Sequence, residues 1–183
     1  QLLRAHSEIG SSESTVVRAA HGFLDADSSG AALNYVASVY ANNDIADPNG
    51  IQYAKAALLE ARTMAAPENL HPDQWVDQRR LMIGETLHIL GRLQVINARI
   101  GPALESLEAA VDSVPDSPGI LRSLADLYDE TGNRSGALEM HMSVLRLVYK
   151  DDDARAGVER LYPELNGYRT STITVIDTLI ANA

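Results

Sequence analysis

An internal repeat of about 34 residues is the feature of this sequence that most constrains its fold. When the chain is shifted by one repeat length, apolar and small side chains align over two successive segments. The aligned residues are Leu87 with Leu121, Leu90 with Leu124, Gly91 with Ala125, Ala103 with Ala137, Leu104 with Leu138, Glu105 with Glu139, Ala110 with Val144 and Val111 with Leu145. This spacing predicts two amphipathic helices in each repeat. Because one such pair cannot bury its own apolar face, successive pairs should stack.

The repeat resembles the tetratricopeptide family, whose unit is a helix-turn-helix of this same length. Gly132 and Asn133 stand where that family turns between its helices, and Pro115 stands where it often places a closing proline. The sequence departs from the family at Tyr149, in place of a closing proline, and at Gln94, in place of an aromatic residue. The resemblance covers residues 30–150, most regularly 84–150. It implies an all-α, right-handed α-solenoid of stacked antiparallel helix pairs that binds proteins or peptides.

A third, less regular copy lies upstream, where Leu33, Val36, Ala37 and Tyr40 reproduce the first-helix spacing. Its second helix is predicted over 51–64, after a long turn over 42–50 that includes Pro48 and Gly50. From Asp73 the apolar pattern predicts one continuous helix to about Ile96. We therefore expect one domain with these parts: 1–29, N-terminal helices; 30–66, irregular repeat; 67–83, insertion and start of a long helix; 84–117 and 118–150, repeats; 151–183, capping helices.

Both ends of the chain are predicted to add helices. Near the N-terminus we expect helices over 2–9 and 15–24, with Ser14 or Thr15 as the N-cap of the second. Asp151, Asp152 and Asp153 indicate a solvated helix start, because carboxylates suit the positive end of the helix dipole. That helix should end at about Tyr162, before Pro163.

The last segment, 172–183, fits either a helical stripe or the alternation of a strand. We favour a closing helix that folds back on the last repeat, because the rest of the chain is helical and solenoid ends need covering. If it did not fold back, its apolar residues would offer a surface for a homodimer or for docking to another domain. Those residues are Ile173, Val175, Ile176, Leu179 and Ile180.

Composition excludes several classes of function. The 183 residues include 25 Asp and Glu against 15 Lys and Arg, a net charge of −10, which argues against nucleic acid and anionic membranes as partners. No apolar run approaches the roughly 20 residues of a membrane span, so no membrane insertion is expected. The absence of cysteine excludes thiolate zinc sites and thiol catalysis.

No motif in the sequence predicts a cofactor, a metal or a catalytic residue. The five histidines are scattered without metal-ligand spacing, and His141 is expected to be a packed or surface residue. Asp151–Asp153 lacks the alternating ligands, glycine and distal glutamate of a calcium loop. Glycines stand singly, without the pattern of a phosphate loop.

The first helices of stacked pairs line the inner, concave face of a solenoid, which predicts a polar binding groove. Arg92 and Arg122 are its best candidates for a partner's carboxylate, because a guanidinium presents a planar fork of donors. Each residue, taken singly, could also be an ordinary solvated side chain. The predicted groove residues are Asn34, Ser38 and Asn42 from the first copy, Glu85, His88 and Arg92 from the second, and Arg122, Asp126 and Asp129 from the third.

Some members of the family grip the acidic C-terminus of chaperones with a clamp of basic and asparagine residues. Here Asn34 stands where that clamp would want a basic residue, Ser38 where it would want an asparagine, and Ile89 where it would want another asparagine. The resemblance therefore does not imply a chaperone partner.

The leading hypothesis is thus a non-enzymatic module that binds a protein or peptide of basic or neutral charge. One alternative is an accessory or substrate-recruiting domain of a larger enzyme whose catalytic part lies elsewhere. A weaker one is a helical enzyme with His88 in its groove. The bias of 13 Arg to two Lys favours a bacterial source and leaves cytoplasm and periplasm open.

Overall fold

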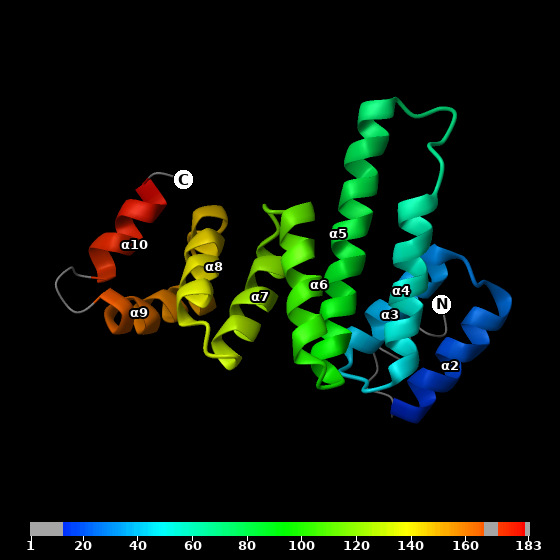
Figure 1. Ribbon diagram of the computed structural model, residues 1–183, viewed down its shortest axis with the longest axis horizontal. Helices are drawn as coiled ribbons and strands as arrows, with labels where there is room; N and C mark the ends of the chain where they lie inside the picture. Colours follow the sequence, from blue (N-terminus) through cyan, green and yellow to red (C-terminus); the bar gives the residue numbers. More distant parts are fainter. Residues whose placement is uncertain (1–12, 167–171, 182–183) are drawn as a thin grey trace. The chain divides into compact units, whose positions relative to one another are not determined.

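The computed structural model describes residues 13–166 and 172–181, which form helices joined by turns, with no strand (Figure 1). The predicted all-α class is confirmed. The helix expected over 2–9 lies outside the described residues. The helices are α2 (Glu13–Ala26), α3 (Gly30–Asn42), α4 (Pro48–Thr63), α5 (Pro72–Ile96), α6 (Ile100–Ser113), α7 (Pro118–Glu130), α8 (Arg134–Leu147), α9 (Asp152–Asn166) and α10 (Thr172–Ala181).

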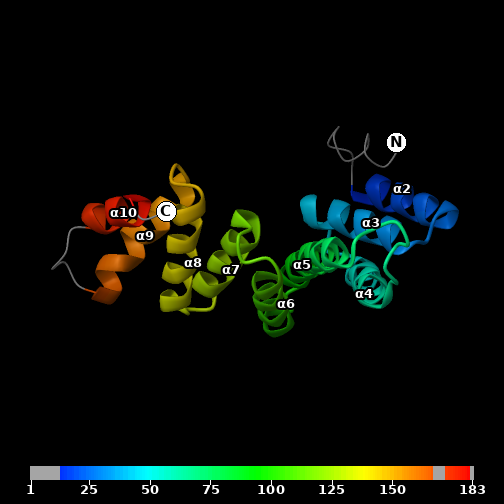
Figure 2. The ribbon, with the colours of Figure 1, turned by 90° about the horizontal axis from the view of Figure 1, so that it is seen from above.

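The described residues form two compact units, one that ends at Ser113 and one that begins at Val114. In the first unit, α3 pairs with α4 and α5 pairs with α6, while α5 also packs on α3 and α4. In the second, α8 packs between its partner α7 and the next helix, α9. Figure 2 shows these successive helix pairs from above. The expected grouping of all these parts into a single domain stays a prediction.

Side-chain caps explain where several helices begin. The Ser29 hydroxyl accepts the N–H of Ala32 at the start of α3, and the Asn133 amide oxygen accepts that of Gly136 at the start of α8. At the start of α4, Asp47 accepts the N–H of Asn49 and Pro48 occupies the first turn, where a proline costs no hydrogen bond. The second helix of the irregular copy therefore starts at Pro48 rather than at the predicted residue 51.

Two glycines allow helices to approach closely. A Cβ atom at Gly91 would lie 2.7 Å from Cδ2 of Leu107, so the small residue predicted there does admit the paired helix α6. Gly50, predicted to lie in a turn, lies inside α4. A Cβ there would lie 2.9 Å from Cδ2 of Tyr40, so the absent side chain makes room for the buried ring of α3.

Three local predictions were wrong. Ser14 and Thr15 lie inside α2, which begins at Glu13, so neither is its N-cap. Helix α9 continues through Pro163 to Asn166. The proline leaves the Glu159 carbonyl without its helical donor, but Glu159 is exposed, so water can replace that donor. Asp151 does cap the start of α9, as predicted, but its side chain is buried rather than solvated, as described below.

The closing segment folds back on the second unit. Helix α10 packs against both α8 and α9, and the side chain of Ile176 is fully buried. The helical prediction for this segment is confirmed and the strand alternative was wrong. The side chains of Ile173, Leu179 and Ile180 lie outside the described set, and a homodimer through the terminal helices stays a prediction.

Candidate binding sites in the two units

In the first unit, Arg92 joins helix α5 to the end of α3. Its Nη1 donates to the Asn42 side-chain oxygen at 2.8 Å, and its Nη2 donates to the Ala41 carbonyl at 2.8 Å. Two of the predicted groove residues are thus brought together, as partners of each other. The Arg92 guanidinium already holds a C-terminal carbonyl of α3, where a positive charge also suits the helix dipole.

The next predicted residues of this unit have more local roles. The Ser38 hydroxyl donates to the Tyr35 carbonyl of its own helix at 2.7 Å. His88 is half-buried, and burial together with the neighbouring Arg92 charge lowers the pKa of His88 to about 4. At neutral pH the imidazole is therefore uncharged.

Asn34 and Glu85 line a small pocket between α3, α4 and α5, with a volume of about 220 Å³. The side-chain oxygen of Asn34 is buried there without a hydrogen-bond donor. Glu60, on the wall of the same pocket, accepts the Gly30 N–H at 2.8 Å and so caps the start of α3 from a neighbouring helix. The Glu60 carboxylate therefore stabilises the contact between α4 and α3.

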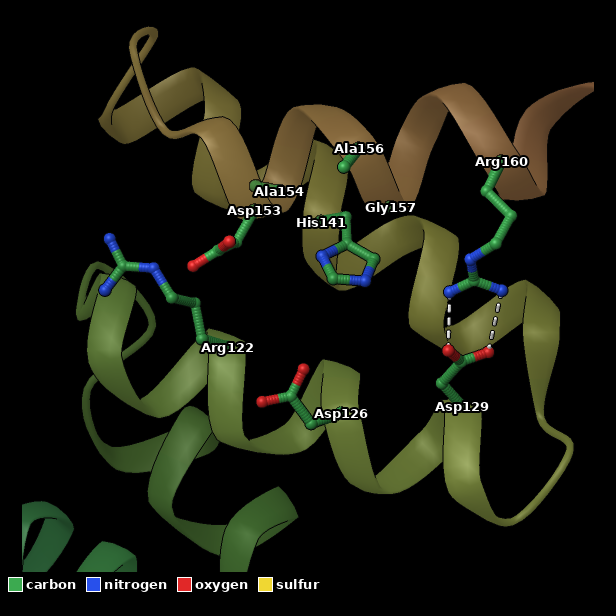
Figure 3. Close-up of a pocket in the computed structure, with 9 residues that line it drawn as sticks. All are labelled: Arg122, Asp126, Asp129, His141, Asp153, Ala154, Ala156, Gly157 and Arg160. Carbon is green, nitrogen blue, oxygen red and sulfur yellow. Dashed lines mark hydrogen bonds and ion pairs between the residues drawn. The ribbon is translucent and has the colours of Figure 1, made fainter.

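In the second unit, a larger pocket opens between α7, α8 and α9, with a volume of about 420 Å³ (Figure 3). We call it the α7–α9 pocket. It contains all three residues that the sequence predicted for this repeat. Its lining residues are Arg122, Asp126, Asp129, His141, Asp153, Ala154, Ala156, Gly157 and Arg160.

Two arginines of the pocket are paired within the chain. Arg160 donates to both carboxylate oxygens of Asp129, at 3.3 and 2.5 Å, as Figure 3 shows. Arg122 donates from Nε and Nη2 to Oδ2 of Asp151, with the Nε contact at 2.8 Å. The role predicted for Arg92 and Arg122, binding a partner's carboxylate, stays a prediction, and in this structure their donors serve the fold.

Asp151 caps helix α9 and binds Arg122 with a side chain that is buried rather than solvated. Its side chain is 7% exposed, and its second oxygen accepts the Ala154 N–H at the start of α9 at 2.8 Å. Burial would raise its pKa, but the hydrogen bonds from Ala154 and Arg122 outweigh burial and hold the pKa of Asp151 below its usual value. The carboxylate is therefore charged at neutral pH.

His141 borders the pocket from α8. It is 7% exposed, and its Nδ1 atom is buried without a hydrogen-bond partner. In Figure 3 this side of the ring faces the space between Asp126 and Asp153. Burial lowers the pKa of His141, and although Asp126 opposes that effect, the net direction is down, so the ring is neutral at pH 7.

Asp126 and Asp153 face the same space from α7 and α9. In the described part of the chain, neither carboxylate forms an ion pair or a hydrogen bond. Partial loss of hydration at the pocket wall is the main cause that raises the pKa of Asp126. The charges of Asp153 and Asp129 add to this effect, and the neighbouring His141 and Arg122 oppose it without reversing it. Negative charge is thus concentrated at this point of the pocket.

Sequence reasoning missed the residues of α8 and α9 in this pocket: His141, Asp153, Gly157 and Arg160. His141 is packed, as expected, yet it also lines the pocket. A signal existed, because Asp153, Gly157 and Arg160 follow a spacing of four and three, the same as Arg122, Asp126 and Asp129. The prediction of a capping helix after the last repeat did not include these residues in the groove.

The described residues also bear on metal binding and on membrane insertion. No group of three or more His, Asp or Glu side chains gathers there in a way that could hold a metal ion. Among the described helices, none combines the length and the apolar composition that crossing a membrane requires.

Comparison with known proteins shows which solved structures have a similar fold. No protein-family profile matches the chain, and no curated protein matches its sequence. Among solved structures, it is similar to the crystal structure of MamA, with a TM-score of 0.60 and 15% sequence identity over 99% of this chain and 94% of that one. The fold class is therefore an all-helical solenoid of the tetratricopeptide-like type.

Proposed function

We propose that this protein is a non-enzymatic interaction module that binds a segment of a partner protein in the α7–α9 pocket. The observation that carries the proposal is the pocket itself, which is open and lined by charged side chains of α7 and α9 and by His141 of α8. Helical repeats commonly bind on the face that their first helices, such as α7, present. Its volume of about 420 Å³ falls within the ~300–1,000 Å³ range of ligand pockets. That size suits one or two side chains of a partner.

The chemistry of the pocket also supports binding rather than catalysis. Its arginines are held by Asp129 and Asp151, and its histidine is buried at Nδ1. A general base must lie within hydrogen-bond reach of the proton it removes, and no such dyad with an accessible nucleophile lines this pocket. A continuous groove that includes Asn34, Ser38, Asn42, Glu85, His88 and Arg92 stays a prediction.

A random-peptide display selection against the full chain tests the proposal. We expect an enriched consensus that binds the wild type and is lost in Asp126→Arg, which fills the pocket with the opposite charge. Glu130→Arg makes the same change at an exposed position of α7 outside the pocket lining and should retain binding. Absence of any consensus, or equal binding by Asp126→Arg, would contradict the proposal.

A further inference from the structure

We infer that the α7–α9 pocket recognises a basic side chain, the guanidinium of an arginine or the ammonium of a lysine, on the partner segment. This inference rests on the proposed function and names the chemistry of its ligand. It begins from the distribution of charge among the residues that line the pocket.

Within the pocket the carboxylates outnumber their positive partners. Arg160 pairs with Asp129, and Arg122 pairs with Asp151, so the Asp126 and Asp153 carboxylates remain without an ion pair among the described residues. Two carboxylates that face one open space repel each other, and a cation placed between them relieves that repulsion. The most favourable occupant therefore carries positive charge.

The buried face of His141 points to the same occupant independently. Its Nδ1 atom has no hydrogen-bond partner and faces the space between the two unpaired carboxylates. With its proton on Nε2, the neutral ring presents Nδ1 as an acceptor. The pocket then offers acceptors from three helices: Asp126 on α7, His141 on α8 and Asp153 on α9.

A group that is rich in donors suits this set of acceptors better than a metal ion does. The described residues contain no cluster of metal-ligand geometry, whereas guanidinium carries five N–H donors and ammonium three. The chain itself shows that a guanidinium fits at this surface, because the Arg160 fork lies on Asp129 at the edge of the same pocket. A second guanidinium would use Asp126 and Asp153 in the same way.

The test is an NMR titration of the ¹⁵N-labelled full chain with synthetic heptapeptides of Gly and Ser around one central residue. The central residue is Arg, Lys or citrulline, and citrulline keeps the shape of arginine without its charge. We expect the Arg and Lys peptides to shift the amide signals of the pocket and to bind about tenfold more tightly than the citrulline peptide. Higher salt should reduce the difference, because the carboxylates are accessible to ions.

Matched variants assign the effect to the two unpaired carboxylates. Asp126→Asn/Asp153→Asn removes both charges and should abolish the preference for the charged peptides. Glu130→Gln/Asp152→Asn changes the net charge equally, on the same two helices, at exposed positions outside the lining, and should keep it. N-acetylarginine amide, titrated separately, distinguishes a free small cation from a peptide side chain and should bind more weakly than the Arg peptide.

The outcomes separate this inference from the proposed function. Equal shifts from the citrulline and Arg peptides, no pocket shifts at all, or tighter binding of the free amide than of the peptide would overturn the inference. A display consensus without basic residues would also overturn it and leave the proposed function standing. Pocket shifts with the Arg peptide but no display consensus would uphold cation recognition and contradict the proposed function.

Discussion

The Arg122 guanidinium and the Asp151 carboxylate join helix α7 to the start of α9. Both Nε and Nη2 of Arg122 donate to Oδ2, while Oδ1 of Asp151 caps α9 through the Ala154 N–H. Arg122→Ala would leave this 7%-exposed carboxylate without its counter-charge. We expect the free energy of unfolding, measured by urea denaturation, to fall by about 1–3 kcal/mol.

Arg134→Ala is the control for the loss of an arginine from the same unit. The Arg134 pair with Glu164 is largely exposed, and such pairs contribute less than about 1 kcal/mol. If Arg122→Ala and Arg134→Ala lowered the free energy of unfolding equally, burial of Asp151 would not strengthen its ion pair with Arg122.

Gly157 gives His141 the room that it occupies in the pocket wall. A Cβ atom at residue 157 would lie 2.4 Å from Cδ2 of the imidazole, so the ring or helix α9 would have to move. We expect Gly157→Ala to lower the free energy of unfolding by about 1–3 kcal/mol, as overpacking does. Gly22→Ala, in α2 with open space around it, should instead stabilise the chain by about 0.5–1 kcal/mol. A stabilising Gly157→Ala would contradict this packing.

Ala98 and Gly132 stand one repeat length apart, at the same point of two successive turns, and both have positive φ, 56° and 80°. That region costs an alanine about 1–2 kcal/mol and a glycine almost nothing. Because glycine also loses more freedom on folding, we expect Ala98→Gly to raise the unfolding free energy by about 0.5–1 kcal/mol and Gly132→Ala to lower it by a similar amount. Thermal denaturation of both variants measures these two changes. Changes of the same sign in the free energy of unfolding would contradict the prediction.

His88 should make the stability of the first unit depend on pH. Because its pKa falls from 6.5 to about 4 on folding, the unfolded chain binds a proton between these values that the folded chain does not. The free energy of unfolding therefore decreases as the pH falls from 6.5 to about 4, with a contribution of about 1–3 kcal/mol from His88. His141 acts in the same direction.

Urea denaturation of His88→Gln at several pH values between neutral and mildly acidic measures this contribution. In the variant, the free energy of unfolding should decrease less as the pH falls, and the remaining decrease should include the contribution of His141. His21→Gln, at an exposed position of α2, controls for removal of an imidazole from the surface. A decrease equally steep in wild type and His88→Gln would refute the assignment.

The closing helix α10 should stabilise the second unit through Ile176. This side chain is fully buried where α10 packs on α8 and α9, and truncation of such residues typically costs about 2–5 kcal/mol. We expect Ile176→Ala and truncation after Asn166 both to lower the melting temperature, measured by circular dichroism. Asp177→Ala, at the next and exposed position, should leave it unchanged. An unchanged melting temperature in the truncated chain would show that α10 is not a cap.

The helical architecture could be predicted because it rests on local and periodic signals. Leu87, Leu121 and their aligned neighbours recur once per repeat, and burial of one face per helix requires that recurrence. The long helix from Pro72 to Ile96 followed from its unbroken apolar pattern. The start of α2 and the passage of α9 through Pro163 were missed, because exposed backbone groups can be satisfied by water and leave little trace in the sequence.

The sequence by itself determined the helices, their pairing and the three residues of α7 that line the α7–α9 pocket, because helical periodicity places a residue on a face. Only the tertiary structure decided what those residues do. Arg122 was predicted to bind a partner, but it meets Asp151 at the start of another helix and leaves Asp126 beside Asp153 and His141. Charge pairing depends on distances between helices, and no pattern along one helix contains those distances.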